Sequence, residues 1–315
     1  MNKRFSEFKS EVIAILTGEK GLIVNPVEVM KNNGVTLQGI NIRRDTEENV
    51  APTIYLEHYF EEYQNGREVE DIAEDIISTL KLNETNMTSK DIANFFTDWE
   101  KVKGQVFCHV IGRESNTDLL KDTPHKELAG IDDVVVVYRV LVPAFLAGAR
   151  ATILVKSSHL KAWGKTVDEL NEVAMENTPK LYPARTQKMS DLLREMLASQ
   201  GAPDFMLEEM TDMGDQPPMY VITNDKTMYG ATNALVFDET LRNLADELDC
   251  DLIVLPSSIH EVIAIPVTKE TENDPTTLLN MVAEVNTTQV APEEVLTTNV
   301  YMFSRVDGIR EFRAA

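Results

Sequence analysis

The chain has 315 residues, of which 43% are hydrophobic and 26% charged. This is an ordinary globular composition, and it excludes fibrous, disordered and membrane-embedded classes. With 52 acidic and 30 basic residues the formal net charge is -22, which repels nucleic-acid phosphates and anionic lipids, so we expect neither as a direct partner. The acids are scattered along the chain, as is typical of a solvated surface; an acidic DNA mimic, the alternative, needs them on one face.

The cysteines and the N-terminal residues predict the compartment. Cys108 and Cys250 lie in apolar surroundings and form no CxxC pair, so we expect free thiols in a reducing compartment. Residues 1–18 lack the continuous apolar core of a signal peptide. No apolar run approaches the roughly 20 residues of a transmembrane helix. We therefore expect a cytoplasmic protein without a membrane segment.

The N-terminal third is predicted to combine helices with one hairpin. Apolar residues at helical spacing from Phe5 to Leu16 predict an amphipathic helix that ends near Gly18. Alternating segments around Asn32-Asn33-Gly34 predict a β-hairpin, with a bulge where the alternation slips at Gly39. Further helices are predicted over residues 52–66, 67–82 and 88–102.

The middle of the chain is predicted to mix strands and helices before a linker. Strands are predicted over residues 105–111, 133–142 and 149–155, the last two as a pair. A helical turn over 158–163 follows, and a capping box of Thr166 and Glu169 predicts a helix to about residue 177. Residues 198–218 contain glycine, proline, serine and acids without periodicity, which predicts a linker.

The C-terminal part is predicted to form a second lobe. Strands are predicted over 220–224, 231–237, 252–255, 259–267 and 300–305, and helices over 239–248 and 275–285, with a last hairpin turn at Val306-Asp307-Gly308. The strands follow one another without regular βαβ crossovers. We therefore expect an α+β fold with mixed or antiparallel sheets and helices packed on them, in two lobes of residues 1–197 and 219–315.

Several segments carry a family resemblance. In chain order they read PTIYLEHYFEEYQNG from Pro52, ATILVKSSHLKAWG from Ala151, MYVITN from Met219, LPSSIHEVIAIPV from Leu255 and EVNTTQVAPEEVLTTNVY from Glu284. On these segments the chain resembles, over most of its length, an uncharacterised bacterial family known only as a domain of unknown function. The C-terminal half is also distantly similar to a second uncharacterised bacterial family. Neither resemblance implies a reaction, a ligand or a catalytic residue.

One segment places a hydroxyl, an imidazole and a carboxylate inside a predicted core sheet: Ser257, Ser258, His260 and Glu261. A hydrolytic serine needs a base within hydrogen-bond reach and a third group that orients the base. In a strand, Ser258 and His260 point to one face and Glu261 to the other, and no GxSxG elbow is present. The competing interpretation is a turn whose hydroxyls and imidazole bond to nearby backbone.

Three side chains on one predicted helix have metal-binding spacing. His58, Glu61 and Glu62 stand at i, i+3 and i+4, a geometry that holds divalent ions in helical proteins. No second ligand motif accompanies them, so we expect a solvated helix face and no metal.

Two further pairs are candidates for binding residues. Trp163 lies one helical turn from His159, and Asn224 and Tyr229 flank a polar turn between predicted strands. Aromatic residues are enriched at interfaces, although helix-to-sheet packing produces the same pattern. The chain has no GxGxxG or Walker sequence, so we expect no nucleotide cofactor.

Together these observations predict a non-catalytic binding or interaction protein with an unknown protein or small-molecule partner. One alternative is a hydrolase or other small-molecule enzyme that uses the turn from Ser257 to Glu261. A second alternative is an inhibitor that mimics DNA by its acidity. A pocket lined by Ser258, His260 and His159 favours the enzyme, whereas bonding of these groups to backbone favours the binding protein.

Overall fold

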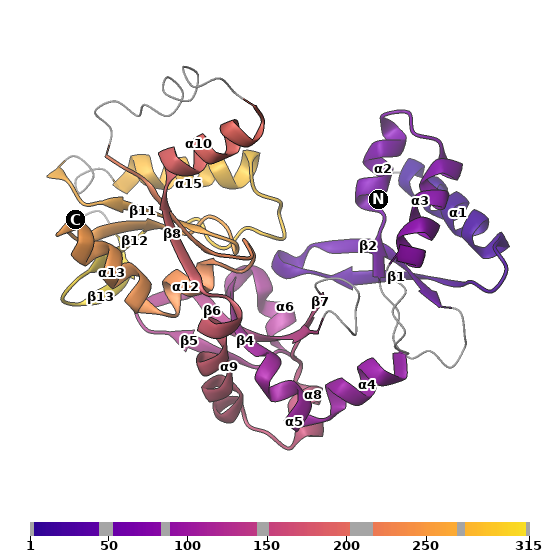
Figure 1. Ribbon diagram of the computed structural model, residues 1–315, viewed down its shortest axis with the longest axis horizontal. Helices are drawn as coiled ribbons and strands as arrows, with labels where there is room; N and C mark the ends of the chain where they lie inside the picture. Colours follow the sequence, from indigo (N-terminus) through magenta and orange to yellow (C-terminus); the bar gives the residue numbers. More distant parts are fainter. Residues whose placement is uncertain are drawn as a thin grey trace.

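Three antiparallel sheets with helices packed on them make up the described part of the chain (Figure 1). The computed structural model describes residues 3–43, 53–82, 89–143, 151–201, 217–269 and 275–312. The predicted α+β class is confirmed. Within these residues, no helix has the length and apolar character that crossing a bilayer requires.

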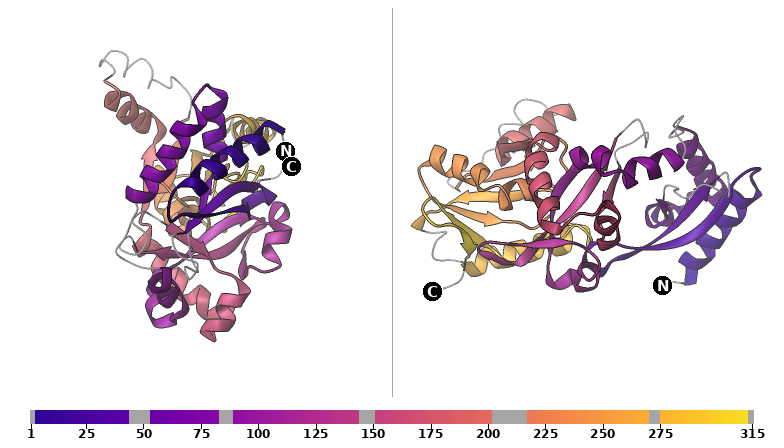
Figure 2. Two further views of the ribbon diagram at one scale, coloured as in Figure 1. Left: turned by 90° about the vertical axis from the view of Figure 1, so that its right-hand side faces the viewer. Right: turned by 90° about the horizontal axis from the view of Figure 1, so that it is seen from below.

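The first sheet belongs to an N-terminal unit with its own core. The unit contains α1 (Lys3–Gly18), β1 (Ile23–Met30), β2 (Thr36–Arg43), β3 (Thr53–Tyr55), α2 (Glu57–Gln64) and α3 (Val69–Leu82), in a sheet of order β1-β2-β3. The apolar stripe of α1 is buried here with Leu56 and Ile72. Figures 1 and 2 show this unit beside the rest of the molecule, with the β1–β2 hairpin reaching across to it.

The predicted hairpin is confirmed, and its turn, η1 (Asn32–Gly34), has the conformation that its sequence favours. Asn33 (φ 60°) and Gly34 (φ 68°) are both left-handed, which asparagine and glycine tolerate best. The bulge predicted at Gly39 is wrong, because β1 and β2 pair without a break. Gly39 is needed for another reason: a Cβ there would lie 2.7 Å from the Thr53 side chain and 2.9 Å from the Ile54 carbonyl oxygen.

The second sheet, of order β4-β6-β5 with β7 also on β6, occupies the middle of the chain. Its strands are β4 (Val106–Gly112), β5 (His125–Leu128), β6 (Ile131–Val142) and β7 (Ala151–Leu154), and its helices are α4 (Ser89–Thr97), α5 (Trp99–Val102), α6 (Thr117–Leu120), α8 (Ser157–Trp163) and α9 (Val167–Leu181). The predicted β6–β7 pair and the Thr166–Glu169 capping box at the start of α9 are both confirmed.

The third sheet has the order β13-β12-β10-β11-β9-β8. Its strands are β8 (Ala184–Lys188), β9 (Tyr220–Asn224), β10 (Leu252–Leu255), β11 (Val262–Pro266), β12 (Tyr301–Ser304) and β13 (Gly308–Glu311), and the helices around it are α10 (Met189–Ser199), α12 (Ala231–Leu235), α13 (Asp238–Leu248) and α15 (Pro275–Thr288). The predicted closing hairpin is confirmed by the β12–β13 pairing.

Four predicted elements differ from the structure. The single helix predicted over 88–102 is two helices, α4 and α5, because Asp98 is extended and caps the start of α5. The strand predicted over 231–237 is instead the helix α12, whose residues are all buried; a short apolar run fits a buried strand and a buried helix equally well. The strand predicted over 259–267 begins only at Val262, after a bend at His260. The helix predicted over 52–66 begins only at Glu57, because Thr53–Tyr55 pairs with β2.

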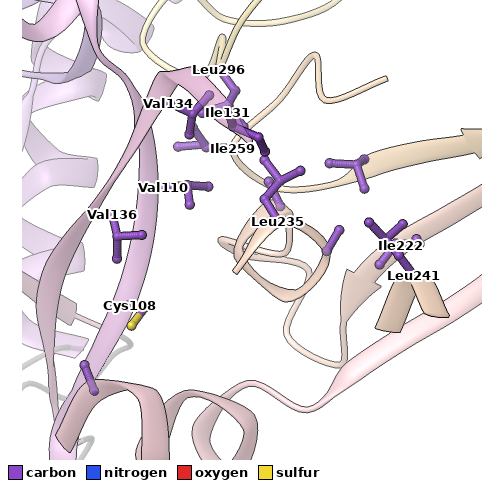
Figure 3. Close-up of a cluster of buried hydrophobic side chains, with 14 of the residues drawn as sticks. Cys108, Val110, Ile131, Val134, Val136, Ile222, Leu235, Leu241, Ile259 and Leu296 are labelled. Atoms are coloured by element: carbon purple, nitrogen blue, oxygen red, sulfur yellow. The ribbon is translucent and has the colours of Figure 1, made fainter. Parts of the chain in front are cut away.

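The grouping of the sheets does not coincide with the predicted lobes. β8 precedes the predicted linker, yet it pairs with β9 along its whole length. The main core also joins side chains of the second and third sheets. Figure 3 shows Val110 and Val136 on one side of this core and Ile222 and Leu241 on the other. Of the predicted linker, residues 202–216 lie outside the described residues, and α10 reaches Ser199.

The two faces of the third sheet have different neighbours. One face, with Ile222, Val254 and Phe303, packs into the main core. The other face, with Ile253 and Ile265, packs on α15. α10 lies over the same face (Figure 1), where its residues Met189 and Leu192 face Val221 and Ile263. The edge strand β8 and the helix α10 that follows it therefore frame one end of the second face.

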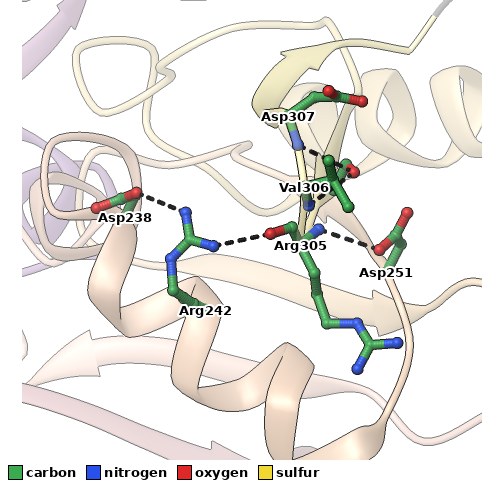
Figure 4. Close-up of polar contacts among 7 residues, drawn as sticks. Asp238, Arg242, Asp251, Arg305, Val306 and Asp307 are labelled. Carbon is green, nitrogen blue, oxygen red and sulfur yellow. Dashed lines mark hydrogen bonds and ion pairs between the residues drawn. The ribbon is translucent and has the colours of Figure 1, made fainter.

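Polar contacts hold the closing turn between β12 and β13 (Figure 4). Ser304 Oγ accepts the backbone N–H groups of the two residues after Arg305, at 3.2 and 3.3 Å. Asp251 accepts the N–H of Arg305 at 3.1 Å, and Arg242 donates to the carbonyl oxygen of Arg305 at 2.9 Å. These bonds satisfy backbone groups that the turn removes from the sheet.

Candidate functional site

The turn after β9 is built by Asn224, a fully buried side chain. Its Oδ1 accepts the backbone N–H of Lys226 at 3.0 Å, and its Nδ2 donates to the Met228 carbonyl oxygen at 2.7 Å. Asparagine side chains stabilise turns by replacing backbone partners in this way. The sequence identifies Asn224 as a binding candidate, and the structure uses it to shape the turn.

The same turn holds two residues in strained conformations. Thr227 (φ 51°) and Tyr229 (φ 60°) are left-handed, which costs about 1–3 kcal/mol for each such residue. The next residue must be glycine, because a Cβ on Gly230 would lie 2.3 Å from the His260 carbonyl oxygen and 2.5 Å from Thr223 Oγ1. Surrounding contacts must therefore impose this shape, and such strain is concentrated at functional sites.

His260 supplies those contacts. Its Nδ1 accepts the backbone N–H of Tyr229 at 3.2 Å, so the proton of the neutral imidazole is on Nε2, which lies 3.2 Å from Glu294 Oε1. Its carbonyl oxygen accepts bonds from Thr223 Oγ1 and the Gly230 N–H, each at 2.9 Å. The imidazole is 20% exposed. His260 thus fixes both the end of the turn and its place on the sheet.

The two serines of the predicted hydrolytic cluster are bonded elsewhere. Ser258 Oγ accepts the backbone N–H of His260 at 2.9 Å and is also hydrogen-bonded to Glu261. Ser257 and Ser258 are both buried, and their segment pairs with residues 294–296. Since the described partners of the imidazole are Tyr229 and Glu294, His260 is not placed as a base for Ser258.

The ring of Tyr229 lies between two histidines. It packs edge-on against His109, with centroids 4.6 Å apart, and lies 5.9 Å from the His260 ring. Its hydroxyl is 3.2 Å from Thr152 Oγ1, which accepts a bond from Arg139 Nε at 3.0 Å. Tyr229 and His260, two separate candidates in the sequence, are therefore neighbours, and β4, β6 and β7 supply the other groups.

A hollow of about 310 Å³ opens on the second face of the third sheet, beside the turn. Its apolar lining comes from Met189 and Leu192 of α10 and from Val221 and Ile263 of the sheet. Its polar lining comes from Arg185, Gln187, Thr223, Thr227 and Glu261. The hollow thus combines a mostly apolar surface with a few polar groups.

Glu261 is the acidic group of this hollow. Burial raises the pKa of its carboxyl, with the charge of Glu294 acting in the same direction and His260 and the Ser258 hydroxyl opposing it. Within the described residues, Glu261 takes part in no salt bridge. A partly buried carboxylate without a cation is energetically unfavourable. Among the residues that line the hollow, Glu261 is therefore the one that a bound cation would stabilise most.

The remaining sequence candidates lie elsewhere. His159 Nδ1 accepts the N–H of Lys156 at 3.0 Å, and its ring packs on Phe96 at 4.7 Å. Trp163 donates from Nε1 to the carbonyl oxygen of Phe96 at 2.8 Å. This pair holds α4 to α8 and does not line the hollow.

Two of the three candidate metal ligands, His58 and Glu62, are part of an ion-pair cluster. His58 Nε2 lies 3.1 Å from Glu62, whose other oxygen pairs with Arg67 at 2.5 Å. Glu61 is exposed on the same helix, α2. In the part of the chain that the structure describes, no group of three histidine, cysteine or acidic residues is arranged to hold a metal ion.

Sequence reasoning did not identify several residues of the site. Arg185, Thr223, Arg139 and Glu294 come from separate strands and loops. Arg185 stands on a strand whose side chains are mostly exposed, so no apolar alternation marks it. Only the pairing of β8 with β9 places it at the hollow.

Fold and site together define an α+β protein with a small, partly apolar hollow beside a strained turn. The chain belongs to a family of unknown function, DUF5688, whose model matches residues 3–305. No curated protein and no solved structure matches the chain. The predicted membership of an uncharacterised family is thereby confirmed.

Proposed function

We propose that the protein is a non-catalytic binding protein and that the hollow framed by α10, β8, β9 and β11 is its ligand site. The observation that carries the proposal is the lining, a mostly apolar surface with a few polar groups, which is the usual composition of ligand sites. The volume of about 310 Å³ is at the lower limit of the roughly 300–1,000 Å³ of such sites. It fits a small molecule.

The bonding of the predicted hydrolytic residues supports binding over hydrolysis. Ser258 bonds to the backbone of His260, and the two imidazole nitrogens face Tyr229 and Glu294. The segment from Ser258 to His260 holds the turn that carries Thr227 to the hollow, and the His260 carbonyl oxygen accepts a hydrogen bond from Thr223 of β9. The polar groups of Ser258 and His260 are thus used to build the wall of a binding site.

A bacterial, cytoplasmic setting without a nucleic-acid partner is part of the same proposal. Cys108 and Cys250 are free thiols, and burial raises the pKa of the Cys108 thiol to about 12, where it is unreactive. Free thiols of this kind are typical of reducing compartments. The net charge of -22 supports a partner other than a polyanion.

A matched pair of variants tests the ligand site. Leu192 and Leu193 are neighbouring, half-buried residues of α10, and only Leu192 lines the hollow. Ligands are first identified as small molecules that raise the melting temperature of the protein or remain bound in native mass spectrometry. Leu192→Trp is expected to fill the hollow and to lower the affinity for each of these ligands tenfold or more. Leu193→Trp, which adds the same bulk outside the hollow, is expected to leave binding unchanged.

Two outcomes contradict the proposal. One is a set of binders whose affinity Leu192→Trp leaves unaltered, since the ligand site is then elsewhere. The other is a catalytic turnover that His260→Ala or Ser258→Ala abolishes without a change in melting temperature. That result would restore the hydrolase alternative, because residues held for catalysis are commonly neutral to stability when removed.

A further inference from the structure

We infer that the hollow binds a small zwitterion with an apolar body, such as an apolar α-amino acid, with its ammonium at Glu261 and its carboxylate at Arg185. The inference rests on the proposed function, because it names the chemical class of the ligand of that hollow. It follows from the register of three strands, which places opposite charges on either side of a threonine at one end of an apolar surface.

The register aligns the lining in two rows. Gln187, Val221 and Ile263 are successive partners across β8, β9 and β11. In the next row on the same face, Arg185 is the partner of Thr223, and continuing the β9–β11 register by one residue brings Glu261 opposite Thr223. Adjacent strands are about 4.8 Å apart, so the Cα atoms of Arg185 and Glu261 are separated by roughly 10 Å. A ligand above Thr223 lies within reach of both side chains.

Glu261 is suited to receive an ammonium. It is partly buried, its hydrogen-bond partner is the Ser258 hydroxyl, and among the described residues it has no salt bridge. A ligand cation supplies the missing countercharge. Thr223 assists, because its hydroxyl proton is donated to the His260 carbonyl oxygen, which leaves its oxygen free to accept a hydrogen bond from the same ammonium.

Arg185 is suited to receive a carboxylate. It donates to Gln187 at 2.7 Å and pairs with Glu195 of α10 at 3.3 Å, and its side chain is 45% exposed. Ion pairs at such exposure contribute little to stability. A ligand carboxylate in bidentate contact makes stronger bonds to the guanidinium and can take the place of Glu195.

The apolar row selects the body of the ligand. Val221 and Ile263 lie beside the charged row, and Leu192 of α10 lines the same space. A polar ligand side chain that lies over Val221, Ile263 and Leu192 would lose its water without gaining a partner from these three residues, which costs about 1–3 kcal/mol. The volume of about 310 Å³ limits the ligand to a single small molecule and excludes a folded protein segment.

Isothermal titration of the full chain with three compounds that share one branched apolar chain tests the inference. L-Leucine carries both charges, 3-methylbutylamine lacks the carboxylate, and 4-methylpentanoate lacks the ammonium. We expect L-leucine to bind and each analogue to bind at least tenfold more weakly. This comparison uses the unaltered protein and does not depend on the folding of a variant.

Two variants assign the charges. Glu261→Gln is expected to lower the affinity for L-leucine about tenfold and to leave the affinity for 4-methylpentanoate unchanged. Arg185→Gln is expected to lower the affinity for L-leucine by a similar factor and to leave the affinity for 3-methylbutylamine unchanged. Melting curves of both variants establish that the sheet is intact.

The outcomes separate this inference from the proposed function. The inference is wrong if L-leucine, L-methionine and L-phenylalanine do not bind while another compound binds in a manner sensitive to Leu192→Trp; the hollow is then a ligand site for another class. It is also wrong if L-leucine binds no better than its two analogues. If no compound at all responds to Leu192→Trp, the inference and the proposed function fail together.

Discussion

His109 on β4 is a buried histidine whose surroundings oppose its charged form. It is 2% exposed, and its Nδ1 has no hydrogen-bond partner among the described residues. Burial lowers the pKa of its imidazole well below 6.5, and the charges of Arg139 and His260 act in the same direction. The neutral ring packs on Tyr229. At the residue scale, the support of the strained turn therefore depends on an uncharged histidine.

This arrangement predicts acid sensitivity that one substitution removes. Above the ordinary pKa of 6.5, His109 is neutral in both the folded and the unfolded chain. Below it, only the unfolded chain takes up the proton, so stability falls with decreasing pH by up to about 1.4 kcal/mol per unit. In His109→Phe this loss is absent, and the difference in unfolding free energy between the two proteins is expected to shrink or reverse from pH 7 to pH 5.

Urea titrations at a series of pH values measure this difference directly. The other ionisable groups are present in both proteins and cancel in the comparison. Parallel curves for the wild type and His109→Phe from pH 7 to pH 5 would show that His109 is protonated in the fold, contrary to the expectation.

At the scale of elements, the tip of the β1–β2 hairpin fastens the N-terminal unit to the rest of the chain. Asn33 donates from Nδ2 to the carbonyl oxygens of Val295 and Pro292, at 2.7 and 2.8 Å, and its backbone N–H donates to Asn116 Oδ1 at 2.8 Å. Asn32 donates to the Glu293 carbonyl oxygen at 2.9 Å. The turn that closes the hairpin is thus also its docking surface.

The segment that receives the hairpin also supports the candidate site. Ile259 N–H donates to the Glu294 carbonyl oxygen at 2.9 Å, and Leu296 N–H donates to the Ser257 carbonyl oxygen at 3.0 Å. The Glu294 carboxylate contacts His260. One short segment therefore bonds to the hairpin on one side and to the histidine turn on the other.

Two substitutions at Asn33 test this attachment. Asn33→Gly keeps the left-handed conformation (φ 60°) and removes the side-chain bonds, whereas Asn33→Asp keeps an acceptor for Ser115 and Asn116 and loses the donors to residues 292 and 295. Each is expected to lower the free energy of unfolding by about 1–3 kcal/mol. Each should also speed amide hydrogen exchange in residues 292–296.

A specific pattern of exchange would contradict the attachment. If Asn33→Gly accelerates exchange within β1 and β2 alone and leaves residues 292–296 protected, Asn33 serves its own turn and does not fasten the unit. Circular dichroism of both variants provides the control for the integrity of the sheets.

At the scale of the whole molecule, the charge of -22 is not neutralised locally. Many of the observed ion pairs join residues three or four apart on exposed helix surfaces, such as Arg242 with Asp238 and Lys180 with Glu176. Such pairs contribute little to stability, because the surrounding solvent screens them. The surface as a whole therefore keeps a strongly negative field.

This field predicts how the protein behaves toward a polyanion. At physiological ionic strength we expect no retardation of duplex DNA in a gel-shift experiment, because the protein has too few cations to release counterions from the phosphates. The same assay with a basic protein of similar size is the positive control. A salt-sensitive shift with plain duplex DNA would show an ordered basic surface that the charge balance does not predict.

The sequence by itself determined the features that depend on neighbours along the chain. Asn33 and Gly34 predicted the hairpin turn, Thr166 and Glu169 predicted the start of α9, and Val306–Gly308 predicted the final hairpin. In each case the side chain acts on backbone within a few residues, so the local pattern contains the cause. The α+β class followed from the order of these elements.

Only the tertiary structure decided which of the candidate residues meet. It joined Tyr229 to His260 across 31 positions, placed Arg185 beside Thr223, and left His159 and Trp163 with Phe96. It also made residues 231–235 a buried helix, where a short apolar run in the sequence predicted a strand. Strand register and burial are set by packing between distant segments, whose free energy no local pattern encodes.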